Sequence, residues 1–136
     1  MKSLSEIETV SKRSCRATGF SWGIAEEVGR NTRMLEMFGL SGIKNLNHYF
    51  RVRNVKKFEK LNLVSKENKT SKLEFCPIIA GLSFLDQVRS LESFREIKFE
   101  KIAYPLLFLP FVSRASEVIG KKLQLKIDSR VFLLNY

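Results

Sequence analysis

Two glycines, Gly19 and Gly39, each follow a stretch with helical periodicity and divide the beginning of the chain into short helices. Glycine readily adopts the left-handed conformation in which helices end. The first helix is predicted to begin at a capping box formed by Ser5 and Glu8, with Leu4 before it as the staple residue. Its apolar face is predicted to contain Ile7, Val10, Ser14 and Ala17.

Two further helices are predicted from serine caps and apolar spacing. Ser21 is a suitable N-cap for a helix over about residues 22–38, and a third helix is expected to begin after Ser41. The second helix should bury Ile24, Ala25, Val28, Thr32, Leu35 and Phe38. The third should bury Ile43, Leu46, Tyr49 and Phe50. Short helices in this order predict a compact helical unit in residues 1–52.

The positive charge is concentrated directly after this unit. Of the net charge of +10, +7 lies in residues 44–72, where nine Lys or Arg side chains face only two acidic ones. Residues 53–72 are therefore predicted to be a basic connector. Tyr49, Phe50 and Phe58 lie among the basic residues, in loose likeness to a groove that stacks nucleic-acid bases and binds phosphates. No recognisable nucleic-acid motif accompanies them, and a solvated connector is the preferred interpretation.

Residues 73–136 are predicted to form a unit of helices and sheet. Pro77 is suited to the first position of a helix that reaches about Leu91. A second helix near Tyr104–Ile119 contains Pro110, which must either kink it or begin it. Strands are expected at residues 73–75, 97–103, 123–127 and 131–134, the last two as a hairpin. The order strand, helix, strand around residues 97–127 favours a right-handed crossover and one sheet.

The fold class predicted from these elements is α+β. We expect a single domain over residues 1–136, with the three-helix unit packed on a small mixed sheet and one or two helices. The polar N-terminus lacks a secretory signal, and the longest apolar run, Ile102–Val112, is about half of the roughly 20 residues that span a membrane. Cys15 and Cys76 have no metal or redox spacing, which favours reduced thiols in a cytoplasm.

Cys76 is the best candidate for a catalytic nucleophile. It precedes Pro77 at the start of a predicted helix, where the helix dipole favours a thiolate. The only candidate base of the histidine type is His48. The preferred interpretation of Cys76 is a small buried apolar residue, as most free cysteines are. With a single histidine in the chain, we expect neither a metal site nor a cofactor.

Trp22 is the best candidate for a binding residue. On a helical wheel it falls with Glu26, Arg30, Arg33 and Met37, opposite the predicted buried face of the second helix. Glu26 and Arg30 are spaced for an i,i+4 ion pair. The face is either covered by the C-terminal half of the chain or free for a ligand or partner, since Trp and Arg dominate such surfaces.

Five stretches of the sequence also form a recognisable set: SLSEIE, GFSWGIAEEVGR, MFGLSG, CPIIAGLSFLD and PLLFLPFVSRAS. Together they resemble a family of small bacterial proteins catalogued as a domain of unknown function, which share L-x-E-I-E, W-G-x-A-E-E and P-L-L-x-x-P-F words. The resemblance covers most of residues 3–127 and is weak between residues 52 and 72. It implies no activity.

A second resemblance is to the N-terminal helical part of the malate/L-lactate dehydrogenase family that lacks a Rossmann fold. Those enzymes have a two-helix opening and then an S-H-G word with a catalytic histidine. Here the corresponding stretch is Leu40-Ser41-Gly42-Ile43, and His48 is not at the matching position. The resemblance therefore implies shared structure and no shared chemistry.

The function that the sequence favours is a non-catalytic cytoplasmic accessory protein that binds a protein partner or a small ligand. Its candidate binding residues are Trp22, Glu26, Arg30 and Arg33. Two alternatives stay open, a small enzyme with Cys76 as its nucleophile and a weak nucleic-acid binder acting through residues 44–72. We expect no membrane partner.

Overall fold

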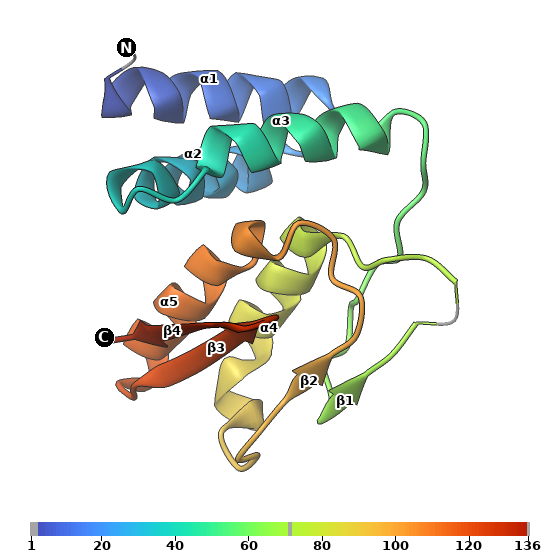
Figure 1. Cartoon of the computed structure of the whole chain (residues 1–136), viewed down its shortest axis with the longest axis vertical. Coiled ribbons are helices and arrows are strands. Elements are labelled where there is room, and N and C mark those ends of the chain that lie inside the picture. Colours follow the sequence, from blue (N-terminus) through green and yellow to red (C-terminus); the bar gives the residue numbers. More distant parts are fainter. Residues whose placement is uncertain (1–2, 71, 136) are drawn as a thin grey trace. The chain divides into compact units, whose positions relative to one another are not determined.

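The computed structural model describes residues 3–70 and 72–135, which divide into two compact units at residues 56 and 57 (Figure 1). The first unit is helical, and the second combines helices with short strands. The structure confirms the α+β class and the N-terminal helical unit that the sequence predicts.

The first unit contains three helices, α1 (Leu4–Ala17), α2 (Trp22–Met37) and α3 (Gly42–Arg53). The two predicted glycine stops are confirmed, since Gly19 has φ of 108° and Gly39 has φ of 73°. Ser21 is the N-cap of α2, and its Oγ accepts a hydrogen bond from the backbone N–H of Ile24 at 3.3 Å. The helix boundaries therefore follow local chemistry closely.

The start of α1 differs from the prediction. Its N-cap is Ser3, whose Oγ accepts a hydrogen bond from the backbone N–H of Glu6 at 3.2 Å. Leu4 is consequently the first residue of the helix and not a staple residue before it. Ser3 and Glu6 have the same three-residue spacing as Ser5 and Glu8, so the sequence offered two caps and the earlier one is used.

The buried face of α1 is also rotated from the predicted one. Ile7, Ser11 and Cys15 are buried, whereas Val10 is 40% exposed. The physical reason is a close crossing with α2. A Cβ atom added at Gly29 would lie only 2.8 Å from the carbonyl oxygen of Glu8. The absence of a side chain at Gly29 of α2 allows this approach, which the periodicity of α1 alone does not reveal.

The other two helices bury most of their predicted residues. In α2, Ala25, Val28, Thr32 and Leu35 are buried, and in α3, Leu46, Tyr49 and Phe50 are. Phe38 was predicted to be buried but is 67% exposed, because it caps the C-terminal end of α2. The guanidinium of Arg53, the last residue of α3, lies 4.1 Å from the ring centroid of Phe20.

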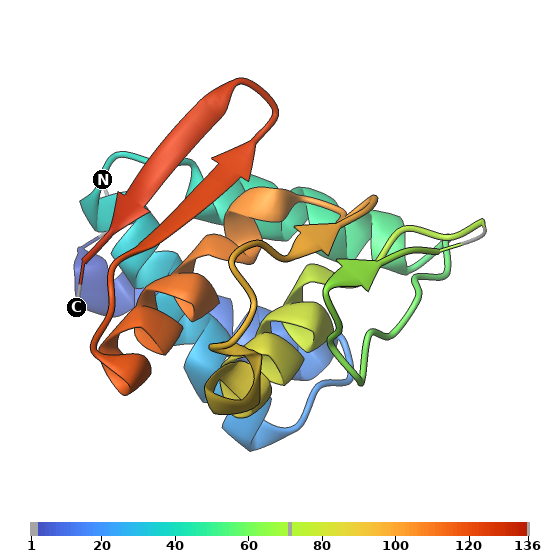
Figure 2. The same ribbon diagram turned by 90° about the horizontal axis from the view of Figure 1, so that it is seen from below.

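The second unit is built on α4 (Pro77–Leu91) and α5 (Leu109–Ile119), which pack side by side (Figure 2). The predicted bounds of α4 are confirmed. A short 3₁₀ helix, η1 (Pro105–Leu107), precedes α5. Pro110 lies in the first turn of α5, where no N–H is required, so this proline begins the helix and does not kink it.

The strands form two small sheets among the described residues. β1 (Glu67–Asn68) pairs in parallel with β2 (Lys98–Phe99), and β3 (Leu123–Ile127) pairs antiparallel with β4 (Arg130–Leu134). The predicted hairpin is therefore confirmed. The predicted crossover is wrong. The strand before α5, β2, and the strand after it, β3, lie in different sheets.

Two predicted strands are shorter than expected. The predicted strand at residues 97–103 is reduced to β2 and a single bridge at Ile102, because Lys101 adopts a left-handed φ of 56° that interrupts the extended chain. The predicted strand at residues 73–75 is reduced to Phe75, which bridges in parallel to both Glu59 and Ile102.

Part of the predicted basic connector belongs to the second unit. Leu61, Val64 and Asn68 are buried. The Gln87 side chain of α4 holds this segment, since its Oε1 accepts from the N–H of Val64 at 2.9 Å and its Nε2 donates to the Asn62 carbonyl at 2.7 Å. The segment is therefore anchored and is not solvated along its whole length.

We predict that Gly29→Ala destabilises the first unit despite the higher helix propensity of alanine, which favours folding by about 1 kcal/mol. The added methyl group meets a backbone oxygen that cannot move aside, and overpacking of this kind costs about 1–3 kcal/mol. Denaturant unfolding followed by Trp22 fluorescence measures the change, because the only tryptophan lies on the same helix.

Gly23→Ala is the matched control on α2. No heavy atom lies within 4 Å of a Cβ atom added there. We expect the free energy of unfolding to stay constant or to rise by up to about 1 kcal/mol. Equal effects of the two substitutions would contradict the close helix crossing at Gly29.

Candidate functional site

The predicted binding residues lie on one exposed face of α2. Trp22 is 55% exposed, and Glu26, Arg30 and Arg33 are exposed as well. The Arg16 guanidinium of α1 lies 5.4 Å from the centroid of the Trp22 ring, within cation–π range. We call this set, Trp22, Glu26, Arg30, Arg33 and Met37, the Trp22 face.

The ion pairs on this face differ from the predicted one. Arg30 pairs with Glu27 and not with Glu26, at 2.7 Å between Nη2 and Oε1. The i,i+3 and i,i+4 positions are both neighbours on a helix, so spacing alone does not choose between them. Arg33 reaches Glu8 of α1 at 3.3 Å, and this contact joins α1 to α2.

Cys76 is at the predicted helix N-terminus but is only 2% exposed. It is the N-cap of α4, and its backbone N–H donates to the Glu59 carbonyl at 2.8 Å. His48 is exposed on α3 in the first unit, so neither unit by itself contains both groups. Cys15 is fully buried. Burial of both thiols agrees with the interpretation of structural cysteines.

The aromatic residues of the basic segment are poorly placed for base stacking. Tyr49 is completely buried, Phe50 is buried and Phe58 is half-buried. Exposed lysines remain, which attract phosphates but provide no stacking platform.

The described part of the chain offers neither a metal site nor a membrane-spanning helix. It contains no group of three or more His, Cys, Asp or Glu side chains arranged to hold a metal ion. Across the same residues, every helix is too short or too polar to cross a membrane.

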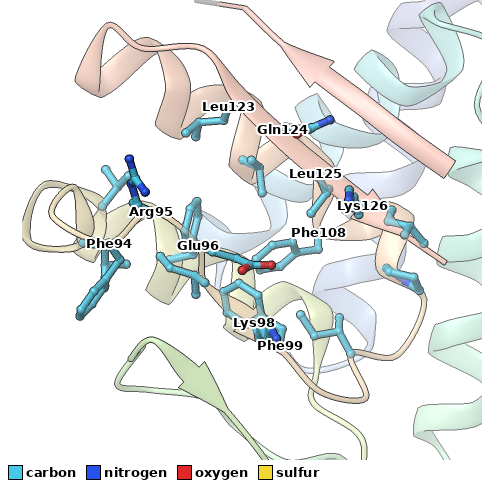
Figure 3. Close-up of a pocket in the computed structure, with 18 of the residues that line it drawn as sticks. Phe94, Arg95, Glu96, Lys98, Phe99, Phe108, Leu123, Gln124, Leu125 and Lys126 are labelled. Carbon is cyan, nitrogen blue, oxygen red and sulfur yellow. The ribbon is translucent and has the colours of Figure 1, made fainter. Parts of the chain in front are cut away.

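The second unit contains a groove that the sequence did not point to. Its volume is about 1120 Å³, and it is bordered by the segment around β2 on one side and by β3 on the other (Figure 3). Helix α4, η1 and α5 with its N-cap supply part of the apolar lining, namely Phe84, Val88, Leu91, Pro105, Phe108, Val112 and Ile119. The segment around β2 and the strand β3 add further apolar residues, among them Phe99 and Leu125.

Three phenylalanine rings form the apolar centre of the groove. Phe99 and Phe108 have ring centroids 5.0 Å apart, and Phe84 lies 5.7 Å from Phe108 and 6.0 Å from Phe99. Phe84 and Phe108 are buried, whereas Phe99 is half-buried. Tilted and edge-on packing at these distances stabilises the cluster beyond its buried area. The cluster is a preformed apolar floor.

The rim of the groove is basic. Six basic and three acidic residues line the groove, a net charge of +3. The basic residues are Arg95, Lys98, Lys101, Lys121, Lys122 and Lys126, and the acidic residues are Glu92, Glu96 and Asp128. All nine are exposed. Lys121 is paired with Glu92 at 3.2 Å between Nζ and Oε1. An apolar floor below a cationic rim is suited to an occupant that is both apolar and anionic.

The hairpin that borders the groove is held by Ser116 of α5. The buried Ser116 hydroxyl contacts the carbonyl oxygen of Lys121 before β3 and lies 3.2 Å from that of Leu134 in β4. The only sequence signal for the groove was the alternation of apolar and charged residues at 97–103 and 123–127, which indicated strands but no shared cavity.

The comparisons with known proteins identify a family for this chain. The sequence model described as "Protein of unknown function (DUF3726)" matches residues 2–77, more than half of the chain, and the chain belongs to that family. The match ends before the groove residues, which begin at Phe84. No curated protein and no solved structure matches the chain, and nothing supports the resemblance to malate/L-lactate dehydrogenases.

We predict that neither cysteine reacts with iodoacetamide in the folded protein, because Cys15 and Cys76 are both buried. In denaturant both should react at the rate of an ordinary exposed thiol. Peptide mass spectrometry after timed alkylation follows each site separately, and Cys15 serves as the internal reference. Rapid native alkylation of Cys76 alone would contradict its burial and revive the enzyme hypothesis.

Proposed function

We propose that the protein is a non-catalytic binding protein that holds an anionic, partly apolar partner or ligand in the groove of its second unit. The observation that carries the proposal is the combination of the Phe84–Phe99–Phe108 floor with a rim of net charge +3. Apolar contact provides affinity, while the exposed charges select the sign of the occupant. The groove lacks the cysteine and histidine on which the enzyme hypothesis depended.

The proposal includes a cytoplasmic location. It is supported by the absence of a disulfide at Cys15 and Cys76, since thiols stay reduced in reducing compartments. The nucleic-acid alternative receives less support, because the aromatic residues near the basic segment are buried or half-buried.

The Trp22 face is a second candidate surface for a protein partner. Its support is the exposure of a large aromatic ring among arginines, a composition typical of the residues that dominate interfaces. This surface lies in the first unit and its test is independent of the groove.

We expect the groove to bind 1-anilinonaphthalene-8-sulfonate, an aromatic anion used here as the probe, in a saturable manner. The double variant Lys98→Glu/Lys126→Glu should weaken binding about tenfold or more, because it reverses two rim charges. Fluorescence titration at low and physiological salt measures the affinity.

The matched control for this titration is Lys57→Glu/Lys60→Glu. It makes the same charge change at two exposed lysines of the second unit that do not line the groove. It should leave probe binding within about twofold of the wild-type value. Equal losses in the two double variants, or no saturable binding, would overturn the groove as the binding site.

We predict that Trp22→Ala changes the free energy of unfolding by about 1 kcal/mol or less, as exposed substitutions do. If Trp22 were core packing, the cost would be about 3–5 kcal/mol. Thermal unfolding followed by circular dichroism distinguishes the two. In the wild-type protein, Trp22 should be quenched readily by acrylamide, a neutral quencher that the basic chain does not attract. A protected Trp22 would remove this surface as a partner site.

A further inference from the structure

We infer that the occupant of the groove is an extended, acidic segment of a partner protein, which pairs as an additional strand with the open edge of β3. The inference rests on the proposed function and names the class of partner.

The residues along β3 show that its edge borders the groove. Successive side chains of a strand point to opposite faces, so one face could contribute only every second residue. Every residue from Lys121 to Asp128 lines the groove, including both Gln124 and Lys126. This is the pattern of a strand whose edge faces the cavity. β4 occupies the other edge, and in the described chain this sheet has no third strand.

The hairpin register identifies the backbone groups at the open edge. Ile127 and Arg130 are paired across a two-residue turn, and the closing pair of such a turn is a hydrogen-bonded pair. Bonding alternates along an antiparallel ladder, so the backbones of Leu125 and Leu123 also face β4. The N–H and C=O groups of Gln124 and Lys126 therefore face the groove side, where an added strand can bond them.

A second open edge borders the same groove. The backbone N–H of Lys98 donates to the carbonyl oxygen of Lys66 at 2.9 Å, and that of Glu100 donates to the carbonyl oxygen of Asn68 at 2.8 Å. Both N–H groups therefore point to the side of β2 on which β1 lies. Because the backbone direction alternates along a strand, the N–H and C=O of Phe99 between them face away from β1. Phe99 lines the groove with its ring as well. Two strand edges around one apolar floor favour an extended peptide over a compact small molecule.

Charge determines which peptide is suitable. Alternate side chains of an added strand would contact the three phenylalanine rings, which requires apolar residues at those positions. The rim of net charge +3 favours acidic residues at the positions between them. A second copy of this chain is a poor occupant, because its net charge is +10. Edge lysines such as Lys126 also discourage pairing between copies.

The test selects binders from random short peptides displayed on phage, with the full-length protein as the target. We expect enriched peptides to be net acidic, free of proline in their centre, and to alternate acidic with apolar residues. Their affinity, measured by fluorescence anisotropy on synthetic copies, should fall about tenfold or more with Lys98→Glu/Lys126→Glu and stay within about twofold with Lys57→Glu/Lys60→Glu.

Backbone pairing has its own readouts. Binding should slow the amide hydrogen exchange of Gln124 and Lys126, the residues predicted to bond the added strand. N-methylation of alternate peptide residues removes donors along one edge only, so one methylation register should abolish binding to β3 while the other is tolerated better. Circular dichroism of each protein variant checks that it is folded.

Three outcomes would overturn the inference. In the first, the selection enriches no acidic peptides. In the second, peptide affinity is unchanged by Lys98→Glu/Lys126→Glu. In the third, peptide binding leaves the amide hydrogen exchange of Gln124 and Lys126 unchanged. If the anionic probe binds the groove while acidic peptides do not, the occupant is a small anion and the proposed function stands. If neither binds, the proposed function fails together with the inference.

Discussion

The second unit depends on one contact, that of Gly81 in α4 with Phe111 in α5. A Cβ atom at Gly81 would overlap Cδ2 of the Phe111 ring, and Phe111 is completely buried. The absence of a side chain at residue 81 therefore sets how closely the two helices approach. Their spacing in turn positions Phe84 and Phe108, which form the groove floor, and Ser116, which holds the hairpin. A larger residue at position 81 would push α4 and α5 apart, and this would displace the groove floor and the hairpin as well.

The distribution of charge in the folded unit differs from that in the sequence. Residues 73–136 contain nine basic and seven acidic residues, which is nearly balanced. Six of those basic residues line the groove, but only three of the acidic ones do. Folding thus concentrates positive charge that a count along the chain averages away. The conspicuous basic segment at residues 44–72 drew attention to a different part of the molecule.

The local sequence predicted the helices and strands better than it predicted which of them pair or pack together. Helix α4, the glycine stops and the β3–β4 hairpin followed from caps, turns and alternation, because each depends on neighbouring residues. The left-handed Lys101 carries no such signal, since lysine has no preference for that conformation, and it shortened the predicted strand. The groove could not be predicted, because it joins segments whose proximity is decided by packing at Gly81. The residues that share the Trp22 face could be grouped from the sequence because one helix defines them, whereas their role as a binding surface stays a prediction.

The pairing of β1 with β2 has a consequence for the order of folding. The partners Glu67 and Lys98 are separated along the chain by all of α4, whereas β3 and β4 meet through a two-residue turn. Closing the longer loop costs more chain entropy, and parallel pairs of this kind form slowly. The β3–β4 hairpin can therefore form early. The pairing of β1 with β2, which places β2 at the other side of the groove, is expected only after α4 has formed. On this route the groove is the last part of the unit to be completed.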